Sequence, residues 1–198
     1  LPDPTVVDVM FLYTPQAVIG EGNAEGIRRR MLESVDETNF RLTNSLINVH
    51  INPVFIGLYN TFESGDLTTD LDRLATGVDG IERVPGLRND FKADLVCLIT
   101  ELENQGLGGQ ARDGTPPKGE AATGFAAIRR LILGRGFMVL AHELGHAVHQ
   151  TLCSPLGTLL ADTPLTLAET ASIFGEGLVF ERLLAEATPD DRRALLAG

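Results

Sequence analysis

The chain has 198 residues, enough for one domain or for two small lobes around a cleft. Apolar residues make up 43% and charged residues 22%, which is typical of a globular protein with a hydrophobic core. The formal net charge of −11 repels phosphate backbones, and no run approaches the roughly 20 apolar residues of a membrane span, so we expect neither a nucleic-acid nor a membrane partner.

The first part of the chain predicts two strands separated by a long helix. A Val-rich apolar run over residues 6–13 predicts a buried strand, which the following Thr-Pro pair ends. Apolar residues recur at about 3.6-residue spacing from 24 to 47 and predict an amphipathic helix. Residues 50–59 predict a second strand, and Pro53 makes it an edge or a bulged strand, because proline donates no backbone hydrogen bond.

A short helix and further strands follow. The helix is predicted over 66–76, because three leucines fall on one of its faces: Leu67, Leu71 and Leu74. Residues 81–91 are either irregular or a short helix, and the apolar run over 94–100 predicts the clearest buried strand. Residues 101–123 are rich in glycine and proline and predict a long loop with room for a short edge strand, and 124–130 predict another strand.

Beyond residue 136 the patterns predict helices only. A helix is predicted over 137–152, and a second, longer one follows. Thr163 and Pro164 predict the start of that second helix, since threonine caps a helix and proline fits its first turn. We therefore expect an α+β lobe with a twisted mixed sheet over 1–152 and a helical lobe over 153–198.

Three of the four histidines stand between positions 142 and 149. His142 and His146 are four positions apart, so on a helix both imidazole rings leave the same face and match two corners of a tetrahedral zinc site. Glu143 follows the first histidine and is placed to face a zinc-bound water as general base. The alternative is a buried helix whose histidines bond backbone carbonyls.

A catalytic zinc site needs a third protein ligand. His149 and Leu152 stand where the pattern His-Glu-x-x-His-x-x-Gly-x-x-His requires its glycine and its last histidine, so that pattern fails here. Glu169, on an otherwise apolar helical stretch, is the candidate instead, because a Zn²⁺ partner removes the cost of burying its charge.

The other histidines, one acid and two cysteines have alternative interpretations. Glu176 either orients a ligand histidine through its ring N–H or lies on a solvated helix face. We expect His149 to pack or to support a ligand rather than to bind the metal, and His50 to bond a carbonyl in a strand. Cys97 and Cys153 either form one disulfide or remain two buried thiols.

Two families are recognisable in different parts of the chain. Residues 1–141 resemble a bacterial reprolysin-like metzincin at 7–17, 37–39, 63–66, 93–96 and 124–130. Residues 142–198 resemble the oligoendopeptidase F (thimet-like) family at 142–150, 161–172 and 174–176. The chain is thus similar to a chimera, natural or engineered, joined through the zinc helix that both families share.

The resemblances imply an α+β, zincin-like fold. The first implies a twisted sheet whose edge strand, within 106–130 here, pairs with an extended peptide, and a secreted protein. The second implies Glu169 as third zinc ligand (the gluzincin pattern), short-peptide substrates and a cytoplasmic protein. It also implies oxyanion-binding His and Tyr residues that would lie beyond Gly198, so we expect the zinc to stabilise most of the oxyanion.

The leading hypothesis is a zinc metalloendopeptidase that acts on peptides or unfolded polypeptides. His142, His146 and Glu169 hold Zn²⁺, and Glu143 is the catalytic base. The alternative is a zinc-binding zincin that is catalytically weak or inactive, because the oxyanion donors are missing. A third hypothesis is a chimera whose two parts never assemble a metal site.

Overall fold

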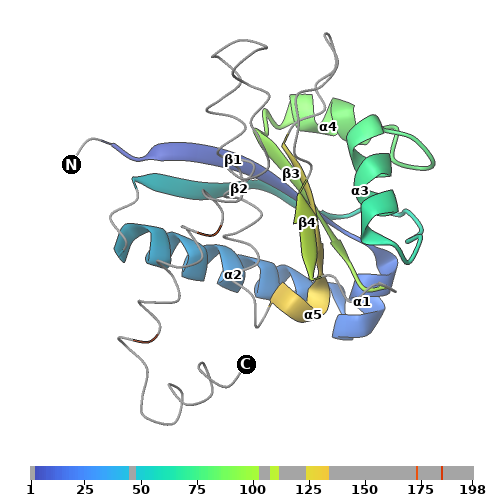
Figure 1. Ribbon diagram of the computed structural model, residues 1–198, viewed down its shortest axis with the longest axis horizontal. Coiled ribbons are helices and arrows are strands. Elements are labelled where there is room, and N and C mark those ends of the chain that lie inside the picture. The colour runs from blue at the N-terminus through green and yellow to red at the C-terminus, as the bar shows by residue number, and fades with distance from the viewer. Residues whose placement is uncertain are drawn as a thin grey trace.

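The computed structural model describes residues 3–44, 48–102, 108–111 and 124–133, together with Ile173 and Leu184. These residues form an α+β fold in which helices cover both faces of a five-stranded sheet (Figure 1). No helix in the described part of the chain has the length and apolar character needed to cross a membrane. The elements in chain order are β1 Thr5–Tyr13, α1 Pro15–Glu21, α2 Ala24–Asn44, β2 Val49–Leu58, α3 Leu67–Thr76, α4 Val84–Asp90, β3 Leu95–Thr100, β4 Gly109–Ala111, β5 Phe125–Arg129 and α5 Arg130–Leu133.

The sheet has the strand order β2-β1-β3-β5-β4. β1 pairs in parallel with β2 and β3, and β3 pairs in parallel with β5. Among the described strands, β4 alone runs antiparallel to its neighbour, at the outer end of the sheet. Parallel strands need crossover connections, and α2 supplies one between β1 and β2, while α3 and α4 lie in the connection from β2 to β3, which pairs on the other side of β1. The expected mixed sheet is confirmed.

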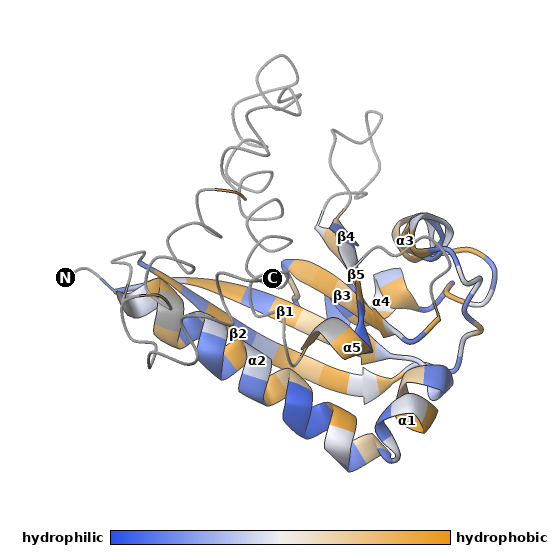
Figure 2. Cartoon of the chain, turned by 60° about the horizontal axis from the view of Figure 1, so that its bottom comes forward, coloured by the Kyte–Doolittle hydropathy of each residue, from blue (hydrophilic) through white to orange (hydrophobic). Residues whose placement is uncertain are grey.

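Two hydrophobic clusters hold the layers together, because successive strand residues point to opposite faces of the sheet. On one face, α2 packs on the sheet, and the buried residues Val9, Phe11, Tyr13, Ile27, Met31 and Val35 belong to one cluster there. On the other face, α3 packs on the sheet, and Met10, Leu12, Leu67, Leu71 and Leu74 belong to one buried cluster there, which confirms the predicted leucine face. Hydrophilic and hydrophobic residues alternate along α2, as a helix between a sheet and solvent requires (Figure 2).

The structure adds a helix that the sequence patterns did not predict. Thr14 ends β1 and also caps α1, since its hydroxyl oxygen accepts the N–H of Ala17 at 3.1 Å. Pro15 occupies the first turn, and Gly22 closes the helix in the left-handed conformation with a φ of 94°. The Thr14-Pro15 pair ends a strand, as predicted, and it is also the same helix start signal that Thr163 and Pro164 provide.

β2 confirms the prediction of an edge or bulged strand. It lies at one end of the sheet, and its register with β1 shifts between Val9 and Met10, which pair with Pro53 and Phe55. Val54 is therefore the extra residue of a bulge. A bulge beside a proline is physically reasonable, because proline has no N–H to offer to a regular ladder.

The remaining predicted elements of the first part are present with small changes at their ends. α3 starts after Asp66, whose carboxylate accepts the N–H of Thr68 at 3.0 Å. The stretch 81–91, for which two alternatives were open, contains α4. β3 is buried along its whole length, and β4 is the short edge strand for which the loop had room.

Several predictions concern parts of the chain outside the described residues. These are the helix over 137–152, the helical lobe over 153–198 and the boundary between the two lobes. Ile173 and Leu184 are described, and both are helical. Cys97 is buried in β3, whereas Cys153 lies outside, so the choice between a disulfide and two thiols stays a prediction.

Candidate active site

The predicted zinc ligands His142, His146 and Glu169 and the predicted base Glu143 lie outside the described residues, as do His149 and Glu176. Within the described ranges, no group of three or more His, Cys, Asp or Glu side chains is arranged to hold a metal ion. What the structure describes is the sheet, its edges and the residues that anchor the segments leading towards the predicted zinc helix.

β4 is the edge strand at one end of the sheet, and some of its backbone groups point away from the sheet. Arg129 donates its backbone N–H to the carbonyl of Gly108 at 2.9 Å, so Gly108 and, two residues further, Gln110 turn their backbone groups towards β5. Gly109 and Ala111 alternate with them and turn their N–H and C=O groups away from β5. Outward backbone groups of this kind can pair with an added extended chain.

The opposite edge, at β2, is covered by α2. The Asn39 side chain accepts the N–H of Ile51 at 2.7 Å and donates to the carbonyl of the same residue at 2.8 Å, as a neighbouring strand would. Arg28 donates to the carbonyl of Ile56 at 3.2 Å. Pro53, two residues after Ile51, has no N–H to present on this side. Of the two edge strands that are described, β4 is therefore the one suited to pairing with a peptide.

The carboxylate of Glu63 joins the carboxyl ends of β1 and β3. It accepts a hydrogen bond from the hydroxyl of Thr14, and it accepts the backbone N–H groups of Glu101 at 2.9 Å and of Leu102 at 2.5 Å. Glu63 is only 8% exposed, so these donors replace the water that burial removes. The carboxylate thus fixes the first residues of the connection from β3 to β4.

A buried ion pair anchors the segment that carries Glu63. Asp70 and Arg73 of α3 meet at 2.9 Å, with side chains that are 2% and 6% exposed. Asp70 accepts the backbone N–H of Ser64 at 3.0 Å, and Arg73 donates to the carbonyl of Phe62 at 2.9 Å while its guanidinium lies over the ring of that residue. Both neighbours of Glu63 are therefore held by one helix.

The same helix contacts the edge strand. The hydroxyl of Thr68, in the first turn of α3, donates to the side-chain oxygen of Gln110 at 2.9 Å. Gln110 is the β4 residue whose backbone faces β5, so its side chain does not compete for the outward backbone groups. α3 consequently links the Glu63 segment to β4.

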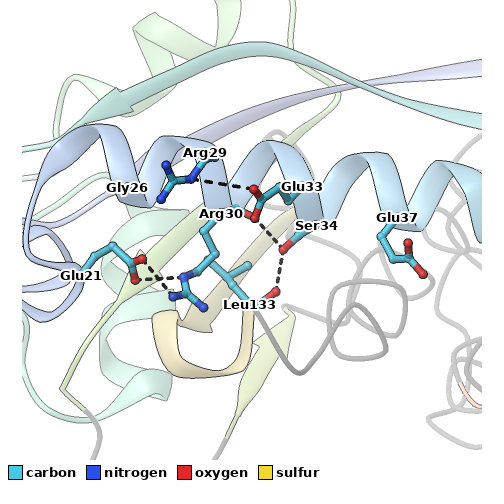
Figure 3. Close-up of a pocket in the computed structure, with 8 residues that line it drawn as sticks. All are labelled: Glu21, Gly26, Arg29, Arg30, Glu33, Ser34, Glu37 and Leu133. Carbon is cyan, nitrogen blue, oxygen red and sulfur yellow. Dashed lines mark hydrogen bonds and ion pairs between the residues drawn. The ribbon is translucent and has the colours of Figure 1, made fainter. Parts of the chain in front are cut away.

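A polar hollow of about 380 Å³ lies between α2 and α5 (Figure 3). On its rim, Arg30 donates two hydrogen bonds of 2.9 Å to Glu21, and the hydroxyl of Ser34 donates to the carbonyl of Leu133 at 2.6 Å. Burial raises the pKa of Glu21, but its hydrogen bonds with Arg30 and Arg130 outweigh burial, so that pKa lies below its usual value. The charged lining fits a structural contact better than a pocket for an apolar ligand.

Comparison with known proteins relates the chain to the metallopeptidases. It is 28% identical over 144 residues to a peptidyl-Asp metalloendopeptidase of Xanthomonas campestris pv. campestris, a match over 72% of this chain and 33% of that protein. Proteins of the same name from two strains of Stenotrophomonas maltophilia are also 28% identical, over 145 and 144 residues. The chain spans about a third (33%) of the length of these curated relatives. No family model matches it.

The fold is also found in solved structures. One of them, described as a chaperone–substrate complex, matches with a TM-score of 0.60 over 73% of this chain and 24% of that chain, at 22% sequence identity. This likeness concerns the fold alone, and it agrees with the α+β fold expected from the sequence.

Sequence reasoning did not single out the residues that anchor the described segments, Asn39, Glu63 and Arg130. A signal was present, because all three lie inside the stretches 37–39, 63–66 and 124–130 on which the first resemblance rests. Each is a polar residue with no expected place in the metal site. In the structure they bind backbone groups or buried charges instead.

Proposed function

We propose that the chain carries the catalytic unit of a zinc metalloendopeptidase. The observation that carries the proposal is the sequence His-Glu-Leu-Gly-His at 142–146 in a chain related to metallopeptidases. α5 ends at Leu133, nine positions before His142, so the sheet and the motif lie near each other along the chain.

The proposed metal ligands are His142, His146 and Glu169. Two neutral imidazoles and one carboxylate form a donor set that suits catalytic zinc, and they leave the fourth position for water. The names of the relatives, which are metalloendopeptidases, support a metal cofactor. Bound zinc supplies Lewis acidity, which lowers the pKa of a water towards about 7 and polarises the peptide carbonyl.

Glu143 is the proposed general base. It takes a proton from the attacking water and delivers that proton to the nitrogen of the leaving amine. Its place beside His142 lets it act on the water without occupying a metal position. Glutamine at this position keeps the size of the side chain and removes the proton acceptor.

The proposed substrate is a peptide that lies extended along β4. The outward N–H and C=O groups of Gly109 and Ala111 are the groups with which it would pair. Pairing of this kind uses only the backbone of the peptide, so it accepts many sequences. The preference for particular side chains must then come from other residues.

We extend to this chain the aspartate in the name of its relatives as the preferred substrate residue. The formal net charge of −11 repels an acidic peptide at long range, so a preference for Asp requires a local cation. Salt screens the long-range repulsion more than a short contact. We therefore expect kcat/KM for an Asp peptide to rise with moderate ionic strength relative to that for its Asn counterpart.

The test measures zinc content and the cleavage of two quenched peptides that differ only in Asp or Asn. We expect one zinc per chain and cleavage of the Asp peptide. Glu143→Gln should keep its zinc and lose about 10²- to 10⁴-fold in kcat, the usual contribution of general acid–base catalysis. Absence of zinc from the purified protein, even after reconstitution, would contradict the proposal.

The zinc affinity of two variants tests the proposed third ligand, Glu169. Glu169→Ala should lose zinc affinity, whereas Glu181→Ala, on the same predicted helix but with no place assigned at the metal, should keep it. Zinc retained as tightly in Glu169→Ala as in the wild-type protein would show that another group fills this position.

A second candidate is a zinc-binding protein with weak catalysis. The tyrosines favour it, because both tyrosines of the chain belong to hydrophobic clusters: Tyr13 is buried beside α2, and Tyr59 packs on the face that α3 covers. We therefore assign neither phenol to the oxyanion. Equal peptide turnover by the wild-type protein and Glu143→Gln, with zinc bound in both, would establish this candidate.

A further inference from the structure

Arg130 lies where two segments of the proposed active site begin. It directly follows β5 as the first residue of α5, and its side chain is 8% exposed. After α5 the chain continues towards the motif at 142–146. Its partner Glu101 directly follows β3 and starts the connection to β4.

The guanidinium of Arg130 binds two carboxylates at once. Its Nε and Nη2 atoms donate to Glu101 at 2.5 and 3.0 Å, and Nη1 donates to Glu21 at 2.8 Å. The hydrogen bonds with Glu101 raise the pKa of Arg130 and outweigh its burial, which acts in the opposite direction. A planar fork that serves two acceptors is a geometry that lysine does not reproduce.

Glu101 is held from both its backbone and its side chain. Glu63 accepts its N–H, and Arg130 binds its carboxylate. The carboxylate lies against the backbone of α1 at Gly20, where a Cβ atom would come within 2.4 Å of the carboxyl carbon. Since Glu101 has so little room, a displacement of Arg130 would displace the start of the connection to β4.

α5 is also bound to α2. Glu21 shares its carboxylate between Arg130 and Arg30, so α5 is tied to α2 through two consecutive ion pairs. The hydrogen bond from Ser34 to Leu133 adds a second tie at the end of α5 (Figure 3). Arg130 is thus the group shared by the anchor of α5 and the anchor of the β3–β4 connection.

We propose that Arg130 is a positioning residue, which fixes the edge strand that receives the peptide relative to the segment that leads to the zinc motif. This inference rests on the proposed function. Without Arg130, Glu21 and Glu101 would lie close together without the cation that separates them. α5 and the connection from β3 to β4 would then no longer be bound to the same side chain.

Hydrogen–deuterium exchange on the full chain tests the mechanical part of the proposal. Arg130→Gln should raise the exchange of the bonded N–H groups of Glu101, Leu102 and Gln110 together with that of α5, about 10-fold or more, while α3 stays unchanged. Arg130→Lys should give an intermediate result and serves if Arg130→Gln does not fold. Arg29→Gln is the matched control, because Arg29 forms an ion pair with Glu33 in which both side chains are 69% exposed.

Kinetics on two peptides of different length test the functional part. A long peptide reaches β4 and a short one does not, so the ratio of their kcat/KM values reports the alignment of the edge with the zinc motif. This ratio should fall about 10-fold or more in Arg130→Lys, since a misplacement of about 1 Å costs on the order of 100-fold. Zinc content should not change.

Two results would overturn the inference. Faster exchange confined to α5 would show that Arg130 stabilises only its own helix. An equal loss of activity on the long and short peptides would indicate general destabilisation. If the zinc-loaded wild-type protein cleaves neither peptide, the proposed function fails and the kinetic role with it, while the exchange experiment still decides whether Arg130 couples the two segments.

Discussion

Asn39, Glu63 and Arg73 each use a side chain to bind backbone groups of another segment. Such bonds have large consequences, because a buried N–H or C=O group that loses its partner costs about 1–3 kcal/mol. A residue of this type shows no periodic pattern in the sequence. It nevertheless decides where the loops next to the sheet lie.

Gly124 is a position where one added carbon should destabilise the protein. It directly precedes β5 with a φ of +86°, and a Cβ atom there would lie 2.8 Å from the carbonyl oxygen of Asp94. Gly124→Ala should lower the free energy of unfolding by about 1–3 kcal/mol, measured by urea denaturation.

Gly86 provides the control for this measurement. It lies in α4, and a Cβ atom there would meet nothing within 4 Å. Gly86→Ala should therefore raise the free energy of unfolding by about 0.5–1 kcal/mol, because alanine loses less backbone entropy in a helix. A loss of stability as large as that of Gly124→Ala would contradict the argument from backbone geometry.

At the scale of elements, the two edge strands of the sheet differ in whether other residues bond their outer backbone groups. α2 covers β2 with side chains that satisfy its outer backbone groups, and β2 also contains a proline and a bulge. β4 is short and turns backbone groups outward. An uncovered edge strand tends to pair with another chain, so covering β2 leaves β4 as the described edge on which pairing is favoured.

The cover on β2 can be removed by one substitution. Asn39→Ala should lower the free energy of unfolding by about 1–3 kcal/mol, because Ile51 loses partners for both its N–H and its C=O. We also expect more self-association, measured by size-exclusion chromatography. Asn52→Ala is the control, since Asn52 is exposed on the same strand and bonds the side chain of Asp8. Similar effects of the two variants would show that edge cover is not what Asn39 contributes.

At the scale of the whole molecule, ion pairs join helices and strands that are distant in the sequence. Glu21 and Arg130 are separated by 109 positions and meet at 2.8 Å. The pairs are partly shielded from solvent, so they hold a geometry that exposed pairs do not. They connect the helices on one face of the sheet to the carboxyl ends of its central strands.

The lowered pKa of Glu21 predicts a pH dependence of stability. Because the folded-state pKa lies below the ordinary value of 4.5, the contribution of Glu21 is fully present above that value and is lost as the pH falls through the folded-state pKa. Urea denaturation should show Glu21→Gln less stable than the wild-type protein near neutral pH, with a difference that shrinks in acid. Glu33→Gln, in the exposed pair, should differ little at any pH. A difference for Glu21→Gln that does not change with pH would contradict the charge-based explanation.

Most elements of the sheet domain could be predicted because their signals are local. The continuous apolar run of β1, the leucine face of α3 and the disruptive effect of Pro53 on β2 depend only on neighbouring residues, and the structure confirms all three. α1 was missed because its start signal coincides with the end of β1 at Thr14, where one residue serves both elements. The zinc ligands stay predictions, since they lie outside the described residues.

The sequence by itself determined the periodic elements, the expectation of an edge strand within the loop after β3, and the close spacing of His142 and His146. The tertiary structure alone decided which charges meet, which edge of the sheet is covered and which glycine has no room for a side chain. The physical reason is distance along the chain. Local patterns follow from bond geometry within a few residues, whereas pairs such as Arg130 with Glu21, or Glu63 with Leu102, exist only after the strand order has brought their segments together.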